Sequence, residues 1–587
     1  MDRRILTAPL MFFVFILFFA VFSRAAFAKV QVKVAVQGVG GAVKKNVLSF
    51  LSIEKLRKSP ELNDDMVKTL FGRAPGEIRE ALQPFGFYTP KINRRLAKEE
   101  GQWQAVFIID PGQPVRISKL ELQITGVGAS QAPFEDFKKT FPLKQGGVLN
   151  EQAYEKAKQN LQEIAANYGF LNATMTRHQI LVYPERHEAQ VFLDLDSGPQ
   201  FRFGDVTFMQ TKNIFSSRFL EKFITFKKGD PYNGTVLVAF QDALSSSEYF
   251  SMVQVAPELK KAVGLYVPIV ATLTAAKRYQ ISVGAGYGTD TGPRGRIDWL
   301  DRWVNRRGHR MEVNLRLAQI RQNAIWRYIV PLDHPLTNHL DYTAGFLHES
   351  TSIETSQSYF AEFSYTRAIS PHWLQTLYFE VERVYFTVAD ESATDKLILP
   401  GATWTYKKAT AELYSNEGVR LIADVVGTSK AMLSSVSFIQ GRLRPKYVHG
   451  IGGFGSLILR GDAGATAVNN FLRLPASYRF FAGGDNSIRG YSYKTLGPEN
   501  SLGLVEGGKY LLVASIEYVQ KIYGKWGLAF FYDGGNAFSQ FPPEWKSGAG
   551  TGIRWSSPVG PVRLDFAWAI SDPSPAFHIY VGIGPEI

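Results

Sequence analysis

Hydrophobic positions follow two different periods in the two halves of the chain. Up to about residue 276, segments that alternate with period two stand beside segments with helical spacing. "VQVKVAV" (Val30–Val36) alternates. "EQAYEKAKQNLQEIAANYG" (Glu151–Gly169) repeats its apolar side chains every three or four residues, and its final glycine stands where a helix C-cap is expected. Residues 216–226 and 233–250 read as two further helices. We therefore predict an α+β first half.

An internal repeat divides this first half. "FIIDPGQPVRISKLEL" (Phe107–Leu122) resembles "FLDLDSGPQFRFGDVTF" (Phe192–Phe208), and each reads as a strand, a Gly/Pro turn and a new strand. Repeats with such long periods indicate an array of small domains. We predict three units, each strand–helix–helix–strand–strand, at residues 29–113, 114–199 and 200–276. One α+β domain with chance similarity is the alternative.

From about residue 277 the helical signal vanishes and short alternating strands follow one another. "RMEVNLRLA" (Arg310–Ala318) and "VRLDFAWA" (Val562–Ala569) each oppose an apolar face to a face with full charges. A soluble sandwich also alternates, but charged faces in strand after strand, with aromatics at strand ends, are typical of outer-membrane barrels. We predict an antiparallel transmembrane β-barrel of about sixteen strands over 277–587. The tryptophans expected at strand ends are Trp299, Trp303, Trp326, Trp373, Trp404, Trp526 and Trp555.

The N-terminus has the three parts of a secretory signal peptide. Arg3 and Arg4 precede an apolar run, Ile5–Phe22, and small residues, Ala26 and Ala28, follow it. This pattern predicts a cleaved signal peptide at residues 1–28, with an uncleaved membrane anchor as the alternative. No stretch of eighteen apolar residues follows, so we expect no helical membrane span after it.

Composition excludes several classes of function. The 587 residues include no cysteine, which excludes disulfide scaffolds, thiolate metal sites and a cysteine nucleophile. The net charge of +13 fits nucleic acid or an anionic membrane surface, but no run of five Lys/Arg occurs, so no nucleic-acid partner is expected. No hydrolase, metalloprotease or P-loop motif is found. We expect no enzyme, no metal site and no cofactor.

Four motifs late in the chain carry a family resemblance. They are "IRGY" (Ile488–Tyr491), "FYDGGNAF" (Phe531–Phe538), "GTGIRWSSPVGPVRLDFA" (Gly550–Ala567) and the closing "FHIYVGIGPEI" (Phe577–Ile587). In this order, after repeated α/β units, they resemble the superfamily of outer-membrane insertases and transporters that carry POTRA domains. The resemblance covers essentially the whole mature chain. It implies an outer-membrane barrel with POTRA domains in the periplasm.

Three POTRA units before a barrel look most like the TamA family, the outer-membrane subunits of the translocation and assembly module. The resemblance implies a factor that helps insert or secrete autotransporter-type barrel proteins without ATP. Its implied partners are unfolded outer-membrane client proteins, the lipid bilayer and a TamB-like inner-membrane-anchored protein that contacts the first unit. A two-partner-secretion-type transporter pore of the same superfamily is the alternative function.

The "IRGY" motif interrupts the strand pattern within a long loop, around 466–507. In the family this loop folds back into the barrel lumen, and its arginine, here Arg489, pairs with an inward acid. Since Leu528, Phe530 and Tyr532 would face lipid, Asp533 would face the lumen, and the same phase places Asp565 there. Asp533 is preferred because it stands in "FYDGG". The alternative is that Arg489 is a solvated cation. The motif residues around it are Ile488, Gly490 and Tyr491.

The first and last barrel strands are rich in residues that weaken sheet pairing. Glycine and proline weaken strands or remove a ladder bond. A weak seam between these strands could open laterally and offer an edge to an incoming strand by β-augmentation. Alternatively, the glycines only make room for the folded-in loop. The predicted seam residues are Gly284, Gly286, Gly582, Gly584 and Pro585.

Overall fold

The structure is a computed structural model that describes residues 30–288, 292–409, 417–557, 560–572 and 576–583. The predicted signal peptide, residues 1–28, lies outside the described residues. The described chain forms two compact units, one within 1–205, 228–235 and 258–268, and one within 206–227, 236–257 and 269–587.

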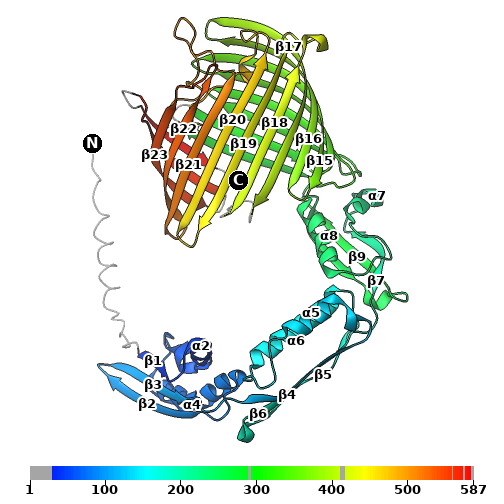
Figure 1. Ribbon diagram of the computed structural model, residues 1–587, viewed down its shortest axis with the longest axis vertical. Coiled ribbons are helices and arrows are strands. Elements are labelled where there is room, and N and C mark those ends of the chain that lie inside the picture. The colour runs from blue at the N-terminus through cyan, green and yellow to red at the C-terminus, as the bar shows by residue number, and fades with distance from the viewer. Residues whose placement is uncertain (1–29, 289–291, 410–416, 558–559, 573–575, 584–587) are drawn as a thin grey trace, which may run out of the picture. The chain divides into compact units, whose positions relative to one another are not determined.

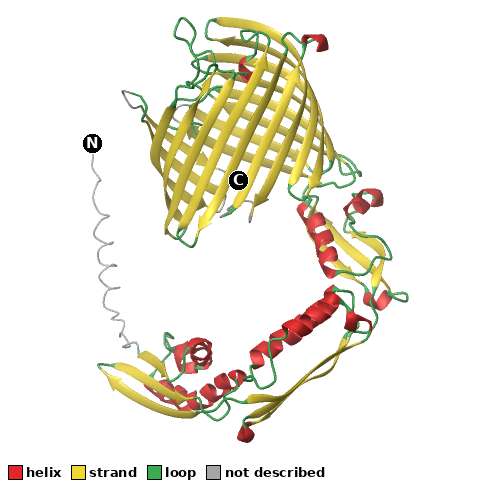
Figure 2. Ribbon diagram, viewed as in Figure 1, coloured by secondary structure: helices red, strands yellow, loops and turns green. Residues whose placement is uncertain are grey.

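Three small sheets precede the barrel, each with helices between its first and second strands (Figure 2). The second and third have the predicted order strand–helix–helix–strand–strand, whereas the first has three α-helices between its first two strands. In each sheet the first strand of the repeat lies beside the last. The first sheet, with its helices, comprises β1 (Gln31–Gln37), α2 (Gly41–Phe50), α3 (Ser52–Leu56), α4 (Asp64–Leu82), β2 (Lys91–Glu99) and β3 (Gln102–Asp110).

The second and third sheets repeat this arrangement, so the α+β prediction with three units is confirmed. The second comprises β4 (Arg116–Thr125), α5 (Ala132–Thr140), α6 (Glu151–Asn167), β5 (Thr174–Tyr183) and β6 (Glu188–Asp196). The third comprises β7 (Arg202–Gln210), α7 (Ser217–Leu220), α8 (Gly234–Ser246), β8 (Phe250–Pro257) and β9 (Tyr266–Ala275). Short 3₁₀ turns are η1 (Gln83–Phe85), η2 (Val127–Ser130), η3 (Pro184–Arg186), η4 (Glu221–Phe223) and η5 (Leu259–Lys261).

Helix α6 shows how local sequence builds these units. The Asn150 side chain accepts a hydrogen bond from the Ala153 amide and caps the helix. Tyr154, Leu161 and Ala165 follow at helical spacing and are buried against the sheet. Among the described residues, no helix is both long and apolar enough to cross a membrane.

The predicted helix over 216–226 is shorter than expected. It consists of α7 (Ser217–Leu220) and η4 (Glu221–Phe223), after which the backbone at Ile224 becomes extended. Aromatic side chains in and next to it form a cluster. The Phe215 and Phe219 rings lie 5.4 Å apart and tilted, and the Phe219 and Phe223 rings lie 5.5 Å apart edge to face. Packing among these rings explains the apolar spacing, which had suggested a longer helix.

The rest of the chain forms a closed barrel of sixteen antiparallel strands in sequence order, as predicted (Figure 1). The long loop between the eleventh and twelfth strands carries "IRGY". The strands are β10 (Tyr279–Gly288), β11 (Gly292–Asp301), β12 (Arg310–Ala318), β13 (Arg321–Pro331), β14 (His339–Ser350), β15 (Glu354–Ser370), β16 (Trp373–Val388), β17 (Glu391–Ala409), β18 (Gly418–Thr428), β19 (Phe438–Ile451), β20 (Gly455–Val468), β21 (Tyr510–Tyr523), β22 (Trp526–Phe538), β23 (Lys546–Ser557), β24 (Gly560–Ala569) and β25 (Phe577–Ile583). Two more 3₁₀ turns, η6 (Lys430–Met432) and η7 (Ala476–Tyr478), lie in its loops.

Apolar side chains cover the outer face of the barrel, while buried polar and charged side chains line its interior. Because side chains alternate along a strand, each outward residue is followed by an inward one. On β22, Phe530 and Tyr532 are exposed on the outer face, whereas Phe531 and Asp533 are buried. Other exposed outward side chains are Ile281, Val283, Leu317, Phe363, Phe379, Leu512 and Ile516.

We expect Leu161→Ala to destabilise the second small domain by about 2–5 kcal/mol, since Leu161 is fully buried in its core. Every α-helix of the described residues lies before residue 247, so the helical circular dichroism signal reports on these domains. Urea unfolding followed by that signal measures the change. Gln162→Ala, at an exposed position of the same helix, is the matched control. Equal stability of the two variants would contradict the assignment of this core.

Candidate functional site

The loop between β20 and β21, residues 469–509, brings Arg489 into contact with the inner wall of the barrel. The Arg489 side chain is completely buried. Its guanidinium donates two hydrogen bonds to the Asp533 carboxylate, from Nε at 2.7 Å and from Nη2 at 3.0 Å. The Arg489 backbone amide donates to the same carboxylate at 3.1 Å. Such a bidentate ion pair fixes the orientation of the guanidinium as well as its distance from the carboxylate. Arg489 is therefore not a solvated cation in this structure.

Asp565, the other acid considered from the sequence, belongs to the same network. Arg489 Nη1 donates to it at 3.3 Å and to Glu517 at 2.8 Å. Arg554 joins these two acids from the other side, at 2.6 Å from Asp565 and as close as 2.5 Å to Glu517. The structure thus places Arg489 against three carboxylates.

Arg460 completes the network and balances its charge. Its guanidinium lies 3.8 Å from the Asp533 carboxylate and donates to the Ser515 hydroxyl at 3.0 Å. Three guanidinium groups (Arg489, Arg460 and Arg554) now face three carboxylates, so the cluster has no net charge. Buried charges are tolerated when they are paired and hydrogen-bonded in this way.

Glycines on β23 make room for the loop and for this network. A Cβ added to Gly548 would lie 1.8 Å from the Arg489 carbonyl oxygen, and one added to Gly552 would lie 2.2 Å from the Asp565 carboxylate. At Gly550 it would lie 2.5 Å from the Phe531 ring. That ring supports the guanidinium, whose central carbon is 3.4 Å from the ring centroid.

The neighbours of Arg489 each have a structural role. Ile488 is fully buried in an apolar cluster with Phe480 and Val513. Gly490 has φ +98°, and a Cβ there would lie 2.5 Å from the backbone of Trp568, so only glycine fits. The Tyr491 hydroxyl donates to Asp572 at 3.3 Å.

Tyr580, on the last strand β25, also holds the motif. Its hydroxyl accepts from the Gly490 amide at 3.2 Å and donates to the Tyr491 carbonyl at 3.1 Å. The loop is therefore tied directly to the strand that closes the barrel.

A second set of contacts ties the loop to the opposite part of the sheet. Lys494 lies 2.5 Å from Glu354 on β15 and 2.6 Å from Glu349 on β14. Arg473 contacts Asp395 on β17 at 2.6 Å. Since the first set lies on β20–β25, the loop braces two separate parts of the barrel wall.

Among the described residues, the seam between β10 and β25 has fewer ladder pairs than any other pair of neighbouring barrel strands. Among the described residues it has one ladder pair, Gly288 with Tyr580. The other neighbouring strands pair over at least seven residues each, the shortest ladder being β24–β25. Across the seam, Arg294 on β11 donates to the Val581 carbonyl at 3.1 Å.

The two predicted seam glycines whose surroundings are described differ in their relation to the loop. A Cβ on Gly284 would meet one neighbour within 4 Å, Arg296 Cβ at 3.9 Å, and one on Gly582 would meet the Arg563 side chain. Gly584 and Pro585 lie outside the described residues. At Gly284, therefore, the loop does not require glycine. Gly582 makes room for Arg563, whose guanidinium lies 3.5 Å from Asp485 of the loop.

The third small domain is docked on the barrel turns that follow β11 and β13. Burial raises the pKa of the Tyr249 hydroxyl, which stays protonated and donates to the Gly308 carbonyl at 2.6 Å. The Phe215 and Trp303 rings lie 5.6 Å apart. Lys222 donates to the Pro331 carbonyl at 3.0 Å.

Trp303 lies just after the end of β11, as predicted, and is buried beside Phe215. Contrary to the prediction, Trp326 and Trp404 lie within β13 and β17 and not at their ends.

Several residues of the network were missed from the sequence. Glu517 and Ser515 alternate with the outward Ile516, and Arg554 alternates with Ile553 and Trp555, so the phase that located Asp533 could have found them. The glycines of "GAGTG" recur with period two on the inward face of β23, which is also visible in the sequence. Within the described residues, no group of three or more His, Asp or Glu side chains could hold a metal ion.

Family models match most of the chain. Residues 277–586 match the Omp85 superfamily domain, residues 33–111 the POTRA domain TamA domain 1, and residues 121–198 a POTRA model described as surface antigen variable number repeat. A stretch of 121 residues, 19% of the chain, is 30% identical to the outer membrane protein assembly factor BamA of Nitratidesulfovibrio vulgaris. That match spans 15% of the length of the curated relative.

One solved structure shows the same fold. The crystal structure of BamA from Haemophilus ducreyi lacking POTRA domains 1-3 has a TM-score of 0.66 at 14% identity, covering 80% of this chain and 99% of that one. CdiB from Acinetobacter baumannii has a TM-score of 0.43 at 16% identity, covering 80% and 87%. Since the first family model covers more than half of the sequence, the chain belongs to the Omp85 superfamily of outer-membrane insertases and transporters, with its POTRA domains in the periplasm.

Proposed function

We propose that this protein helps insert or secrete autotransporter-type barrel proteins by opening the β10–β25 seam and pairing its free edge with a client strand. The observation that carries the proposal is the single ladder pair of that seam among the described residues. The TamA-type match of the first POTRA domain supports the assignment to this branch of the superfamily.

The weak seam supports lateral opening on energetic grounds. Each backbone hydrogen bond contributes about 0.5–1.5 kcal/mol in water, and an unpaired group in lipid costs several kcal/mol. Opening a ladder of seven or more pairs would therefore be prohibitive, whereas β10–β25 has one ladder pair to break among the described residues. The freed edges would then be satisfied by a client strand, so no ATP is needed.

The braced loop supports an insertase over a passive pore. Ile488 and Arg489 are completely buried, and the loop is held to both parts of the wall, so it occupies the lumen in this structure. A barrel of this kind would act through its wall and edge. We propose no catalytic chemistry for it.

The partners follow from the same proposal. Clients are unfolded outer-membrane proteins that arrive in the periplasm. A TamB-like inner-membrane-anchored protein would contact the first POTRA domain, where β1 and β2 are the edge strands of the sheet and can accept an added strand. Docking of the third POTRA domain under β11–β13 would hold a client within a few strands of the seam.

Reconstitution tests the proposed function. The full chain in liposomes, given an unfolded autotransporter-type client without ATP, should raise the yield of heat-modifiable, folded client severalfold over empty liposomes. Electrical conductance of the same liposomes measures pore activity in parallel. High conductance with no gain in folded client would favour the secretion pore and contradict the insertase proposal.

Arg489→Ala should strongly destabilise the barrel. Removing one partner of a buried ion pair costs about 3–5 kcal/mol, and here three carboxylates would lose their shared cation. The measurement is the temperature at which the folded band is lost in gel heat-modifiability, with client insertion assayed beside it. Asp533→Ala should do the same, while the double variant should cost less than the sum, because neither partner is stranded.

Two variants sharpen this test. Arg489→Lys keeps the charge but cannot form the two-pronged contact, so it should rescue only partly. Arg383→Ala removes an exposed arginine of β16 and is the matched control, expected to be neutral. Unchanged heat-modifiability and activity in Arg489→Ala would refute the pinning role of the loop.

A disulfide across the seam should block insertion. The chain has no cysteine, so Gly288→Cys with Tyr580→Cys, at the paired positions, introduces the only thiols. Paired residues of neighbouring strands lie within disulfide reach. The oxidised double variant should lose client insertion, and reductant should restore it.

The reduced form of the same protein is the internal control, and Tyr580→Cys alone reports the loss of the tyrosine hydroxyl. Equal insertion rates before and after reduction of a fully formed disulfide would argue against lateral opening.

A further inference from the structure

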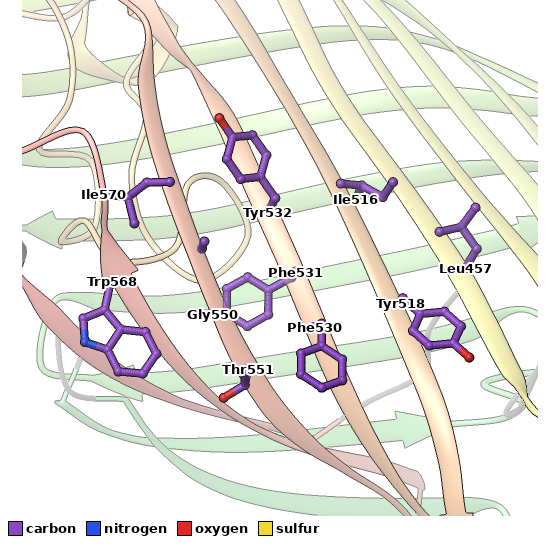
Figure 3. Close-up of a pocket in the computed structure, with 11 residues that line it drawn as sticks. Leu457, Ile516, Tyr518, Phe530, Phe531, Tyr532, Gly550, Thr551, Trp568 and Ile570 are labelled. Atoms are coloured by element: carbon purple, nitrogen blue, oxygen red, sulfur yellow. The ribbon is translucent and has the colours of Figure 1, made fainter.

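An apolar hollow lies on the outer face of the barrel over β20–β24 (Figure 3). Its volume is about 610 Å³. Figure 3 shows Trp568 on one side of Gly550, and Phe530 and Tyr532 on the other. The hollow is therefore bounded by rings from β22 and β24, with β23 between them.

Small residues on β23 create the hollow. Ala549 pairs with Tyr532 on one side and with Trp568 on the other, and Thr551 is the next outward residue along the strand. The neighbouring Gly550 and Phe531 also line it. Two small outward side chains between large rings leave a depression in an otherwise continuous outer surface.

The lining offers hydrocarbon and few free polar groups. The Tyr532 hydroxyl already donates to Ser547 at 2.9 Å, and the Tyr518 hydroxyl donates to Gln520 at 2.5 Å. The remaining lining includes Leu457, Ile516 and Ile570. An occupant is therefore recognised by shape and dispersion, not by hydrogen bonds.

The strands around the hollow exclude an added β-strand as occupant. β22 pairs with β23 from Trp526–Trp555 to Gly535–Lys546, and β23 pairs with β24 from Ser557–Gly560 to Gly548–Ala569, without a register shift. No backbone edge is free there. Since this face is continuous with the exposed apolar surface that meets the bilayer, hydrocarbon chains of lipid surround it.

We propose that this hollow is a binding site for one acyl chain of an outer-membrane lipid. In lipid, association depends on van der Waals packing and on lipid entropy, because burial from water contributes nothing. A chain that fills the space between Trp568 and Tyr532 gains contacts with both rings that it lacks on a flat part of the wall. The site holds a chain two strands away from β25 and lies against Phe531, the ring that supports Arg489.

Photocrosslinking tests this site. The full chain is placed in nanodiscs that contain phosphatidylethanolamine with a diazirine in its acyl chain, and adducts are mapped by peptide mass spectrometry. We expect adducts on Ala549, Thr551 and Trp568 to exceed those on the outer face of β15 severalfold, and excess unlabelled lipid to reduce them.

Ala549→Leu fills the floor of the hollow and should lower these adducts severalfold. Ala361→Leu is the matched control, since Ala361 is an outward alanine of β15 between Ala344 and Val381. Heat-modifiability confirms that both variants fold. If Ala549→Leu does not fold, the positions of the adducts on the unsubstituted protein test the lipid site.

Adducts spread evenly over the outer face would overturn the proposal, as would a crosslinked pair of protein chains joined at this hollow. Neither result bears on client insertion, so the lipid site and the proposed function can fail separately.

Discussion

The structure depends on one constraint: a sheet in lipid can leave no backbone hydrogen-bonding group unpaired. Sixteen strands meet it by closing into a barrel. Closure also creates an enclosed interior, where the charged faces of the strands must find partners. The long strands β15, β16 and β17 pair over many residues. Among the described residues, the short closing strand β25 has the fewest ladder pairs where it meets β10.

A loop fills the interior, and it fits there because glycines on β23 leave space where side chains would otherwise stand. Gly548, Gly550 and Gly552 remove three side chains from one inward face, and the space admits the Arg489 backbone, the Phe531 ring and the Asp565 carboxylate. Because three guanidinium groups meet three carboxylates, the buried cluster needs no counterion. Shape and charge therefore specify the same position of the loop, and a shift of either partner would leave a charge without a bond.

The periodicity of apolar residues in the sequence was sufficient to predict much of this fold and part of the site. Repeated strand–helix–helix–strand–strand units and sixteen alternating strands are local patterns, and the outward phase of Leu528, Phe530 and Tyr532 located Asp533. Contacts that form only when the barrel closes could not be predicted from sequence periodicity. Lys494 meets Glu349 and Glu354 only because the sheet curves round to the loop, and no spacing along the chain encodes that distance. Likewise, Trp303 reads as an interfacial aromatic until Phe215 is placed on it. The number of paired residues at the seam depends on strand register, which glycine content does not fix.

One residue links the weak seam to the loop. The Tyr580 backbone makes the single described ladder pair with Gly288, and its hydroxyl bonds to the Gly490 amide and the Tyr491 carbonyl. If β25 moved away from β10, Tyr580 would either carry the loop with it or give up two hydrogen bonds to buried groups. Arg489 resists the first outcome, since its guanidinium is held by acids on β21, β22 and β24. The bonds that Tyr580 shares with a loop anchored elsewhere therefore hold β25 in place beside the one ladder pair described at the seam. Opening of the seam, as proposed, would have to break these bonds as well as that pair.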